Sequence, residues 1–465
     1  MQFDSVVFLV FFLVVFVLYY LVARWHTVQN LFLLAASFVF YGWWDWRFLG
    51  LMILSSGIDY VAAVLVETTT DARRRKIFLV ASLTSNLVIL GFFKYAGFFA
   101  DSLARLVPLL ATPGWRSTLD VVLPVGISFY TFQSISYVVD VYRGRVRAER
   151  DPFVYLAFVA FFPHLVAGPI QRATDLLPQF RRPRHLTAAA VRRALWLVIY
   201  GLFLKSVVAN GAATFVDAAF RAGQESGWSV ILGTIAFGIQ IYMDFNAYSL
   251  IARGIAMLLG FELVWNFRLP YLSTSLREFW RRWHISLSTW LRDYLYVPLG
   301  GNRRGRLRAG LNLLITMTLG GLWHGAAWNF VAWGLLHGTG LAIERALGGE
   351  AREKRRAWIP GWPVTMTVVF AGWFLFRVPS WAVASDMVRA LANLTWTPAH
   401  GATVRALAAL ATPVAIVELW QLRRDDLLAP TMLGAWAYAA LLAGFTILTI
   451  AMFNEFNYAF IYFQF

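Results

Sequence analysis

Apolar runs separated by short basic segments repeat along the whole chain. Most of these runs have about 17–25 residues, the length at which a helix crosses the hydrocarbon core of a bilayer. The pattern predicts an all-α, polytopic integral membrane protein with about 11 transmembrane helices plus re-entrant segments. Because the run 6–22 lacks a basic start and a small-residue cleavage site, we expect it to be kept as the first helix. The expected spans lie near 5–23, 28–45, 47–66, 77–98, 121–141, 190–210, 227–244, 362–378, 404–421 and 432–453, with a shorter apolar piece at 247–262.

Clusters of Lys and Arg set the expected orientation of these spans. They lie at 73–76, 143–150, 303–308 and 352–356. Cytoplasmic loops of membrane proteins carry an excess of basic residues, so we expect these four segments on the cytoplasmic side. Counting spans outward from them places both termini on the opposite, periplasmic side. The parity of the chain around 247–275 stays open.

The apolar run 153–168 has basic segments on both sides, which makes a single crossing inconsistent with the orientation. It also contains Pro163 and ends at Gly168-Pro169, residues that interrupt a helix. Broken backbone at membrane depth is tolerated only where protein or a cavity surrounds it. We therefore expect a re-entrant segment beside a funnel that opens to the cytoplasm.

A second apolar run with basic flanks, 309–343, carries no charged residue and contains His324. Its length fits a hairpin of two short helices, with the break at Trp323-His324-Gly325. Ionisable side chains at membrane depth are costly and usually face the protein interior or a wet cavity. The position therefore favours a functional His324. The alternative is a buried histidine that is bonded to a neighbouring carbonyl group.

The segment 275–308 combines an aromatic and a basic stripe at helical spacing. The aromatic stripe consists of Trp280, Trp283, Leu287, Trp290 and Tyr294, and the basic stripe of Arg277, Arg281, His284, Ser288 and Arg292. This pattern predicts an amphipathic helix that lies at the interface or on the floor of a cavity. A plain interfacial anchor helix is the alternative.

The composition of the chain excludes several classes of partner and of reaction. The chain is 59% hydrophobic with a net charge of +16, but its Lys and Arg lie in short loops, where they meet anionic headgroups, so we expect no nucleic-acid partner. No linker divides the sequence, and we expect one domain over 1–465. The chain has no cysteine, which excludes disulfides and a cysteinyl acyl intermediate.

None of the seven histidines is paired at the spacing of metal ligands on a helix, so we expect no metal site. His324 and His337 are thirteen residues apart, about 20 Å along one helix. The sequence has no glycine-rich phosphate loop and no G-x-S-x-G motif. A histidine without a serine or cysteine signature suits general-base work on a bound hydroxyl group. We assign no role to His337.

Several of these stretches together resemble the membrane-bound O-acyltransferase (MBOAT) family. The resemblance is greatest to its bacterial branch, which includes membrane proteins of alginate O-acetylation and of teichoic-acid D-alanylation. It implies that His324 is the catalytic histidine, that His284 is a second functional one, and that helices form a ring around a central funnel. The matching stretches are FVFYGWWDWRFL (38–49), LPVGISFYTFQSISYVVDVYRG (123–144), FFPHLVAGPIQR (161–172), REFWRRWHISLSTWLRDYLYVPLGGNRRG (277–305), TLGGLWHGAAWNFVAWGLLHG (318–338) and FIYFQF (460–465).

One departure from the family pattern falls at 244–250. The chain reads DFNAYSL there, where the family often has a D-F-S-G-Y-S-D type stretch. The missing carboxylate at Leu250 weakens an assignment of alginate as the acceptor. Two roles stay open for Asp244: it could form an ion pair with an arginine such as Arg253, or it could line the tunnel. Arg281, Arg282, Asp244 and Trp323 are the candidate substrate-binding residues.

The resemblance implies transfer of an acyl group, most simply acetyl, from a cytoplasmic thioester donor to an exported polysaccharide. The donor would be a coenzyme A or carrier-protein thioester, with no bound cofactor. The expected partner is a periplasmic SGNH-type acetyltransferase, and the expected location is the bacterial inner membrane. Two alternatives remain, D-alanyl or other acyl transfer to a cell-envelope polymer, and a polysaccharide export component without chemistry of its own.

Overall fold

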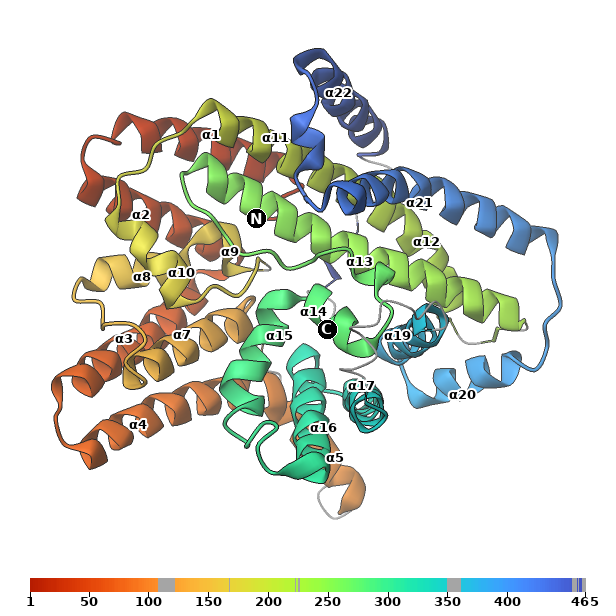
Figure 1. Cartoon of the computed structure of the whole chain (residues 1–465), viewed down its shortest axis with the longest axis horizontal. Coiled ribbons are helices and arrows are strands. Elements are labelled where there is room, and N and C mark those ends of the chain that lie inside the picture. The colour runs from red at the N-terminus through yellow and green to blue at the C-terminus, as the bar shows by residue number, and fades with distance from the viewer. Residues whose placement is uncertain are drawn as a thin grey trace. The chain divides into compact units, whose positions relative to one another are not determined.

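The computed structural model describes residues 1–107, 122–166, 168–221, 223–224, 226–348, 361–453, 458 and 460–461. These residues form helices connected by turns and loops, and no strand occurs among them (Figure 1). The predicted all-α class is confirmed. The contacts divide the chain into two compact units, one of residues 1–191 and 255–264 and the other of residues 192–254 and 265–465.

Three helices of the first unit begin at capping residues. Ser5, Asp71 and Asp151 each accept a hydrogen bond from a backbone N–H group of the following first turn. The expected interruption of 153–168 is present, because α8 ends at Ala160 and α9 begins at Phe162. The helices are α1 (Val6–Leu21), α2 (His26–Asp45), α3 (Arg47–Thr68), α4 (Ala72–Leu90), α5 (Ala96–Leu106), α7 (Ile127–Tyr142), α8 (Pro152–Ala160), α9 (Phe162–Leu165) and α10 (Ala173–Leu176).

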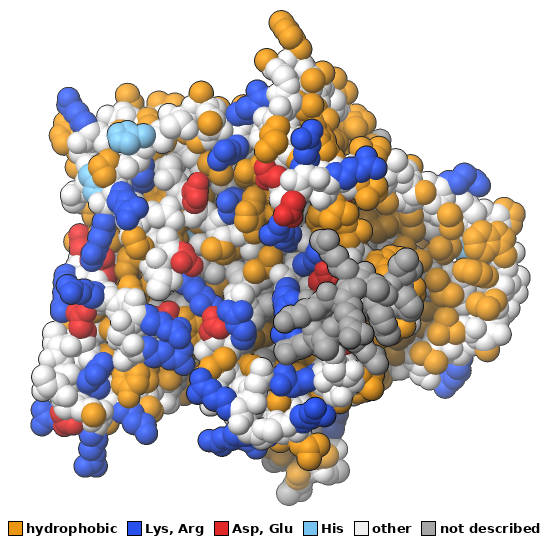
Figure 2. Space-filling model, in the orientation of Figure 1, with side chains coloured by type: hydrophobic (Ala, Val, Ile, Leu, Met, Phe, Trp, Pro, Cys, Tyr) orange, Lys and Arg blue, Asp and Glu red, His pale blue; other side chains and the backbone are white. Residues whose placement is uncertain are grey.

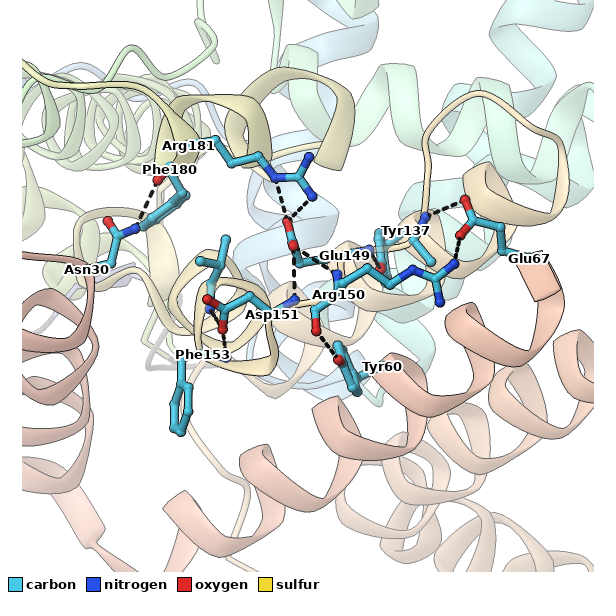
Figure 3. A network of polar contacts seen from close by, with 12 residues as sticks. Asn30, Tyr60, Glu67, Tyr137, Glu149, Arg150, Asp151, Phe153, Phe180 and Arg181 are labelled. Carbon is cyan, nitrogen blue, oxygen red and sulfur yellow. Dashed lines mark hydrogen bonds and ion pairs between the residues drawn. The ribbon is translucent and has the colours of Figure 1, made fainter. Parts of the chain in front are cut away.

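A polar network in this unit fixes the basic loop between α7 and α8 (Figure 3). The buried Glu149 carboxylate is paired with Arg181 at 2.8 Å and accepts the backbone N–H of Asp151 at 3.1 Å. Arg150, next in the chain, is paired with Glu67 of α3. The hydrogen bond to Glu149 raises the pKa of Arg181. Two ion pairs thereby hold the end of the loop that leads into α8.

The second unit contains the hairpin and the segment 275–308. Its helices are α11 (Ala188–Phe203), α12 (Asn210–Ala219), α13 (Gly227–Leu258), α14 (Leu276–Arg282), α15 (Ile285–Leu291), α16 (Gly305–His324), α17 (Trp328–Ala346), α19 (Gly361–Arg377), α20 (Trp381–Ala390), α21 (Pro398–Arg424) and α22 (Ala435–Met452), of which α11 and α13 cross the boundary between the units.

Six helical stretches in the described ranges are long and apolar enough to cross a membrane. Other expected spans form somewhat shorter helices, such as α1 with 16 residues and α19 with 17. Most side chains of α21 and α22 are not buried, as expected of helices that face lipid. The face shown in Figure 2 carries many more Lys and Arg side chains than Asp and Glu, in line with the net charge of +16. The chain is a multi-pass membrane protein.

The predicted hairpin is confirmed. α16 ends at His324, α17 begins at Trp328, and the two helices pack along each other (Figure 1). Glycines permit this approach: a Cβ added at Gly321 would lie 2.1 Å from the carbonyl oxygen of Phe330, and one at Gly334 2.4 Å from that of Met317. Only residues without a side chain allow backbones to come this close.

Two predictions are wrong in detail. The spans expected at 227–244 and 247–262 form one continuous helix, α13. Asp244, at the junction of the two runs, is buried in this helix and paired with Lys205. The single amphipathic helix expected over 275–308 is broken. α14 ends at Arg282, His284 adopts a left-handed conformation with φ of 41°, and α15 follows from Ile285. The two stripes therefore change direction at the break.

Candidate active site

His324 is the last residue of α16, at the point where the hairpin turns. The next residue, Gly325, is extended, and α17 begins three residues later, so the helix end aims the imidazole into the protein. Only 5% of His324 is exposed. Aromatic rings surround it, with centroids at 5.0 Å for Trp323, 5.1 Å for Trp333 and 5.3 Å for Phe376. Helices α16, α17 and α19 thus enclose this imidazole.

His284 lies at the break between α14 and α15, where its positive φ is uncommon for a residue with a side chain. Backbone hydrogen bonds hold the break: the N–H of Ile285 donates to the carbonyl of Asn266 at 2.8 Å, and that of Arg268 to the carbonyl of Arg282 at 3.0 Å. The Asn266 side chain in turn accepts from Ser286 at 2.6 Å. Such conformations persist where the surroundings fix them, and they concentrate at functional sites.

The two histidines, predicted from sequence as the catalytic pair, come together. Their ring centroids lie 6.4 Å apart, and Trp323 contacts both rings. His284 is fully buried, and neither of its ring nitrogens has a hydrogen-bond partner among the described residues. Buried polar groups are usually paired. The arrangement therefore offers a proton acceptor to a reacting group that enters beside His324.

A third histidine, His337 of α17, belongs to the same cluster. It is fully buried, and its ring lies 4.9 Å from Trp333 and 5.2 Å from Trp280. In the described part of the chain its ring nitrogens also lack a hydrogen-bond partner. Sequence reasoning gave His337 no role because it was expected in a loop or at a helix end. The structure places it inside α17, where Trp333 contacts both its ring and that of His324.

The other candidate residues divide between the site and its surroundings. Trp323 is part of the site. Arg281 is exposed on α14, and Arg282 is paired with Glu278 at 2.6 Å. Asp244 is paired with Lys205 at 2.9 Å, which is an ion pair as one alternative had it, but with a lysine in place of Arg253.

A cavity of about 280 Å³ opens beside the aromatic cluster. Three arginines line it, Arg277, Arg292 and Arg345, together with Glu344, Trp280, neutral polar side chains and apolar residues. Trp280 also packs against Trp333 with centroids at 5.6 Å, so it separates the cavity from the ring that contacts His324. Arg277 and Arg292 belong to the predicted basic stripe. Arg345 was missed, and its place directly after the apolar run is the signal that could have indicated it.

The described residues contain no group of three or more His, Asp or Glu side chains that could hold a metal ion. The polar groups are instead the imidazoles of the cluster and, in the cavity, three guanidinium groups beside the Glu344 carboxylate and several hydroxyl and amide groups. Such a set can accept and donate protons at a carbonyl or hydroxyl group and can bind an anion.

The helices and the enclosed histidines define a polytopic membrane protein with an internal site suited to proton transfer. The chain matches the sequence model of the MBOAT, membrane-bound O-acyltransferase family over residues 146–372, a range that includes both predicted catalytic histidines. The chain belongs to this family and is an O-acyltransferase.

Three relatives show the range of the similarity. A probable alginate O-acetylase of Azotobacter vinelandii is 43% identical, with 85% of this chain and 79% of the relative covered. A peptidoglycan O-acetyltransferase of Helicobacter pylori is 33% identical, with 78% and 74% covered. A teichoic acid D-alanyltransferase of Streptococcus thermophilus is 28% identical, with 54% and 64% covered.

Proposed function

We propose that this enzyme moves an acetyl group from a cytoplasmic thioester donor across the membrane for O-acetylation of an exported polysaccharide. Two observations support the acetyl group and the class of acceptor: relatives named for alginate and peptidoglycan O-acetylation cover more of the chain, at higher identity, than the D-alanyltransferase does. Alginate and other cell-surface glycans are both compatible with this reading.

The histidine pair is the observation that carries the chemistry. His324 takes the proton of the attacking hydroxyl group as its oxygen forms a bond to the thioester carbonyl carbon. The carbon–sulfur bond then breaks, and the proton passes to the leaving thiolate, so that an ester and a free thiol result. The ring of His284, 6.4 Å away between centroids, lies close enough to help place the hydroxyl group or relay the proton. Base catalysis of this kind requires a buried, uncharged imidazole within reach of the reacting group.

The arginine-lined cavity is the proposed donor site. Coenzyme A and the prosthetic group of a carrier protein both carry phosphate, and guanidinium groups bind phosphate through paired hydrogen bonds. Arg277 and Arg345 would hold the phosphate, while Trp280 would border the path of the thioester toward His324. The thioester is a substrate here, and no resident cofactor is required.

The basic segments support the proposed orientation. We place the protein in the bacterial inner membrane with 73–76, 143–150, 303–308 and 352–356 in the cytoplasm and both termini in the periplasm. The acetyl group would then be passed outward, to a periplasmic SGNH-type acetyltransferase that modifies the polymer. The hydroxyl group that attacks at His324 can therefore belong to this partner instead of the sugar.

D-alanyl transfer is the second candidate, favoured by the similarity to the teichoic acid D-alanyltransferase. Membranes that contain only this enzyme would be supplied with radiolabelled acetyl-coenzyme A or with a D-alanyl carrier protein. Acetyl transfer to an added acceptor fraction supports the proposal. Transfer of D-alanine alone would replace it, and transfer from neither donor, with export of the polymer dependent on the protein, would favour an export component.

A further inference from the structure

The buried ion pair between Lys205 and Asp244 also binds the backbone of another segment of the chain. Lys205 Nζ donates to the backbone carbonyl of Tyr458 at 3.0 Å, and the backbone N–H of Ile461 donates to Asp244 Oδ2 at 2.8 Å. Tyr458, Phe460 and Ile461 follow α22 and are named the tail segment here. Lys205 and Asp244 are each about 1% exposed. Two opposite charges therefore satisfy one carbonyl and one N–H group of an irregular chain.

The tail segment leads to the histidine site through aromatic contacts. The ring of Phe460 is fully buried and lies 4.1 Å from Tyr248 and 6.1 Å from Phe245, between centroids. Phe245 in turn meets the imidazole of His284 edge-on at 4.6 Å. The residue that holds the tail, Asp244, and the residue that contacts His284, Phe245, are therefore neighbours on the same helix, α13.

Local backbone geometry supports a special role for Lys205. It lies in a π-helical turn, Leu204–Ala209, between α11 and α12. Such turns are rare and frequent at functional sites. The extra residue in the turn lets a long cationic side chain enter the interior of the unit, where a membrane-spanning helix would otherwise present an apolar residue.

We propose that the Lys205–Asp244 pair is a clamp that positions the tail segment as part of the wall behind His284, and that acyl transfer depends on the clamped tail. The pair takes no part in the reaction itself. It acts through Phe460 and Phe245, which fix the ring of His284 relative to His324. The inference rests on the proposed role of the two histidines.

Two double variants test the clamp without leaving one charge buried alone. Lys205→Met with Asp244→Leu removes both charges and both hydrogen bonds to the tail, whereas Lys205→Gln with Asp244→Asn removes the charges but keeps one donor and one acceptor. Replacing a whole buried ion pair by apolar residues is often neutral for stability, so the apolar pair is expected to reach the membrane in normal amount. The surface pair Arg389→Met with Asp386→Leu serves as the matched control, because both of its residues are well exposed.

Two readouts are taken on every variant. Because the chain has no cysteine, Ile461→Cys introduces a single thiol at a position that is 1% exposed. Its labelling by a membrane-permeant maleimide reports whether the tail is held. Acetyl transfer from the thioester donor is measured in the same membranes, with kcat and KM for the donor determined separately.

The apolar pair should label at least about tenfold faster and lose about 100-fold in kcat, as expected when a reacting group is misplaced by about 1 Å. The amide pair and the surface pair should both stay near the parent in labelling and in kcat. An apolar pair that labels slowly, or labels fast yet transfers acetyl groups normally, would overturn the clamp. Faster labelling in a chain whose parent transfers no acetyl group would leave the clamp standing and contradict the proposed function instead.

Discussion

Replacing His324 distinguishes a catalytic imidazole from one that only fills space. General-base catalysis contributes about 10²–10⁴-fold to a rate, equivalent to about 2.7–5.4 kcal/mol of activation free energy at 1.36 kcal/mol per factor of ten. His324→Gln retains most of the volume enclosed by Trp323, Trp333 and Phe376 and a hydrogen-bond donor, but cannot accept and release the proton. We expect it to lose this whole factor while the protein still inserts.

His324→Ala should be equally inactive, but for two reasons. Only 5% of His324 is exposed, so the alanine variant leaves a cavity among three aromatic rings. Large-to-alanine changes in cores cost about 2–5 kcal/mol of unfolding free energy. Its abundance is therefore expected to fall, and the glutamine variant is the informative one.

His337→Gln is the matched control. It replaces a histidine that is at least as buried and also lies against Trp333, so its cost for packing should be similar. We expect it to retain activity within about tenfold, because His337 is proposed to take no proton. The assay is acetyl transfer by isolated membranes, with the acetyl content of secreted polymer and membrane abundance measured beside it. An active His324→Gln variant would refute the reasoning, and unacetylated polymer exported in normal amount would remove the export-component alternative.

Further predictions concern the donor site, the orientation and the hairpin. Arg345→Ala should raise KM for the thioester donor about tenfold at unchanged abundance, the loss of one charged hydrogen bond. Arg281→Ala should also raise KM for the thioester donor if α14 borders the funnel, whereas an unchanged KM at a normal protein level would favour an interfacial anchor role for this helix. A single cysteine at position 304 should resist an impermeant reagent in intact cells, and labelling there would contradict the orientation. Gly321→Val should lower the thermal midpoint in detergent, because even a Cβ would lie 2.1 Å from the carbonyl oxygen of Phe330; an unchanged midpoint would argue against this packing.

The hairpin could be predicted because several independent signals agreed. An apolar run too long for one crossing, basic flanks on both sides and paired glycines all indicated two helices with a break at His324. Helix α16 ends at that residue. Membrane depth restricts the chain to few solutions, so length and flanking charge determine the topology of such a segment.

The break at His284 could not be predicted because the helical spacing of the stripes continues through it. What ends α14 is a pair of backbone hydrogen bonds to the segment 266–268, which lies outside the periodic window. The partner of Asp244 was missed for a related reason. Several basic residues were available along the sequence, and only the fold brings Lys205 to it. Tertiary contacts of this kind leave no periodic pattern.

The placement of both histidines at interrupted backbone argues for function over packing. His324 ends a helix and His284 adopts a left-handed conformation, so each position gives up regular helical hydrogen bonding inside an apolar region. A left-handed residue of this type costs about 1–3 kcal/mol, and a histidine without a hydrogen-bond partner adds a further cost when buried. A glycine would avoid both costs at position 284. The chain instead places an imidazole there, 6.4 Å from a second one, and supports it with Asn266 and Phe245. An arrangement that is unfavourable for stability and yet supported from several helices is the expected physical signature of a reactive centre.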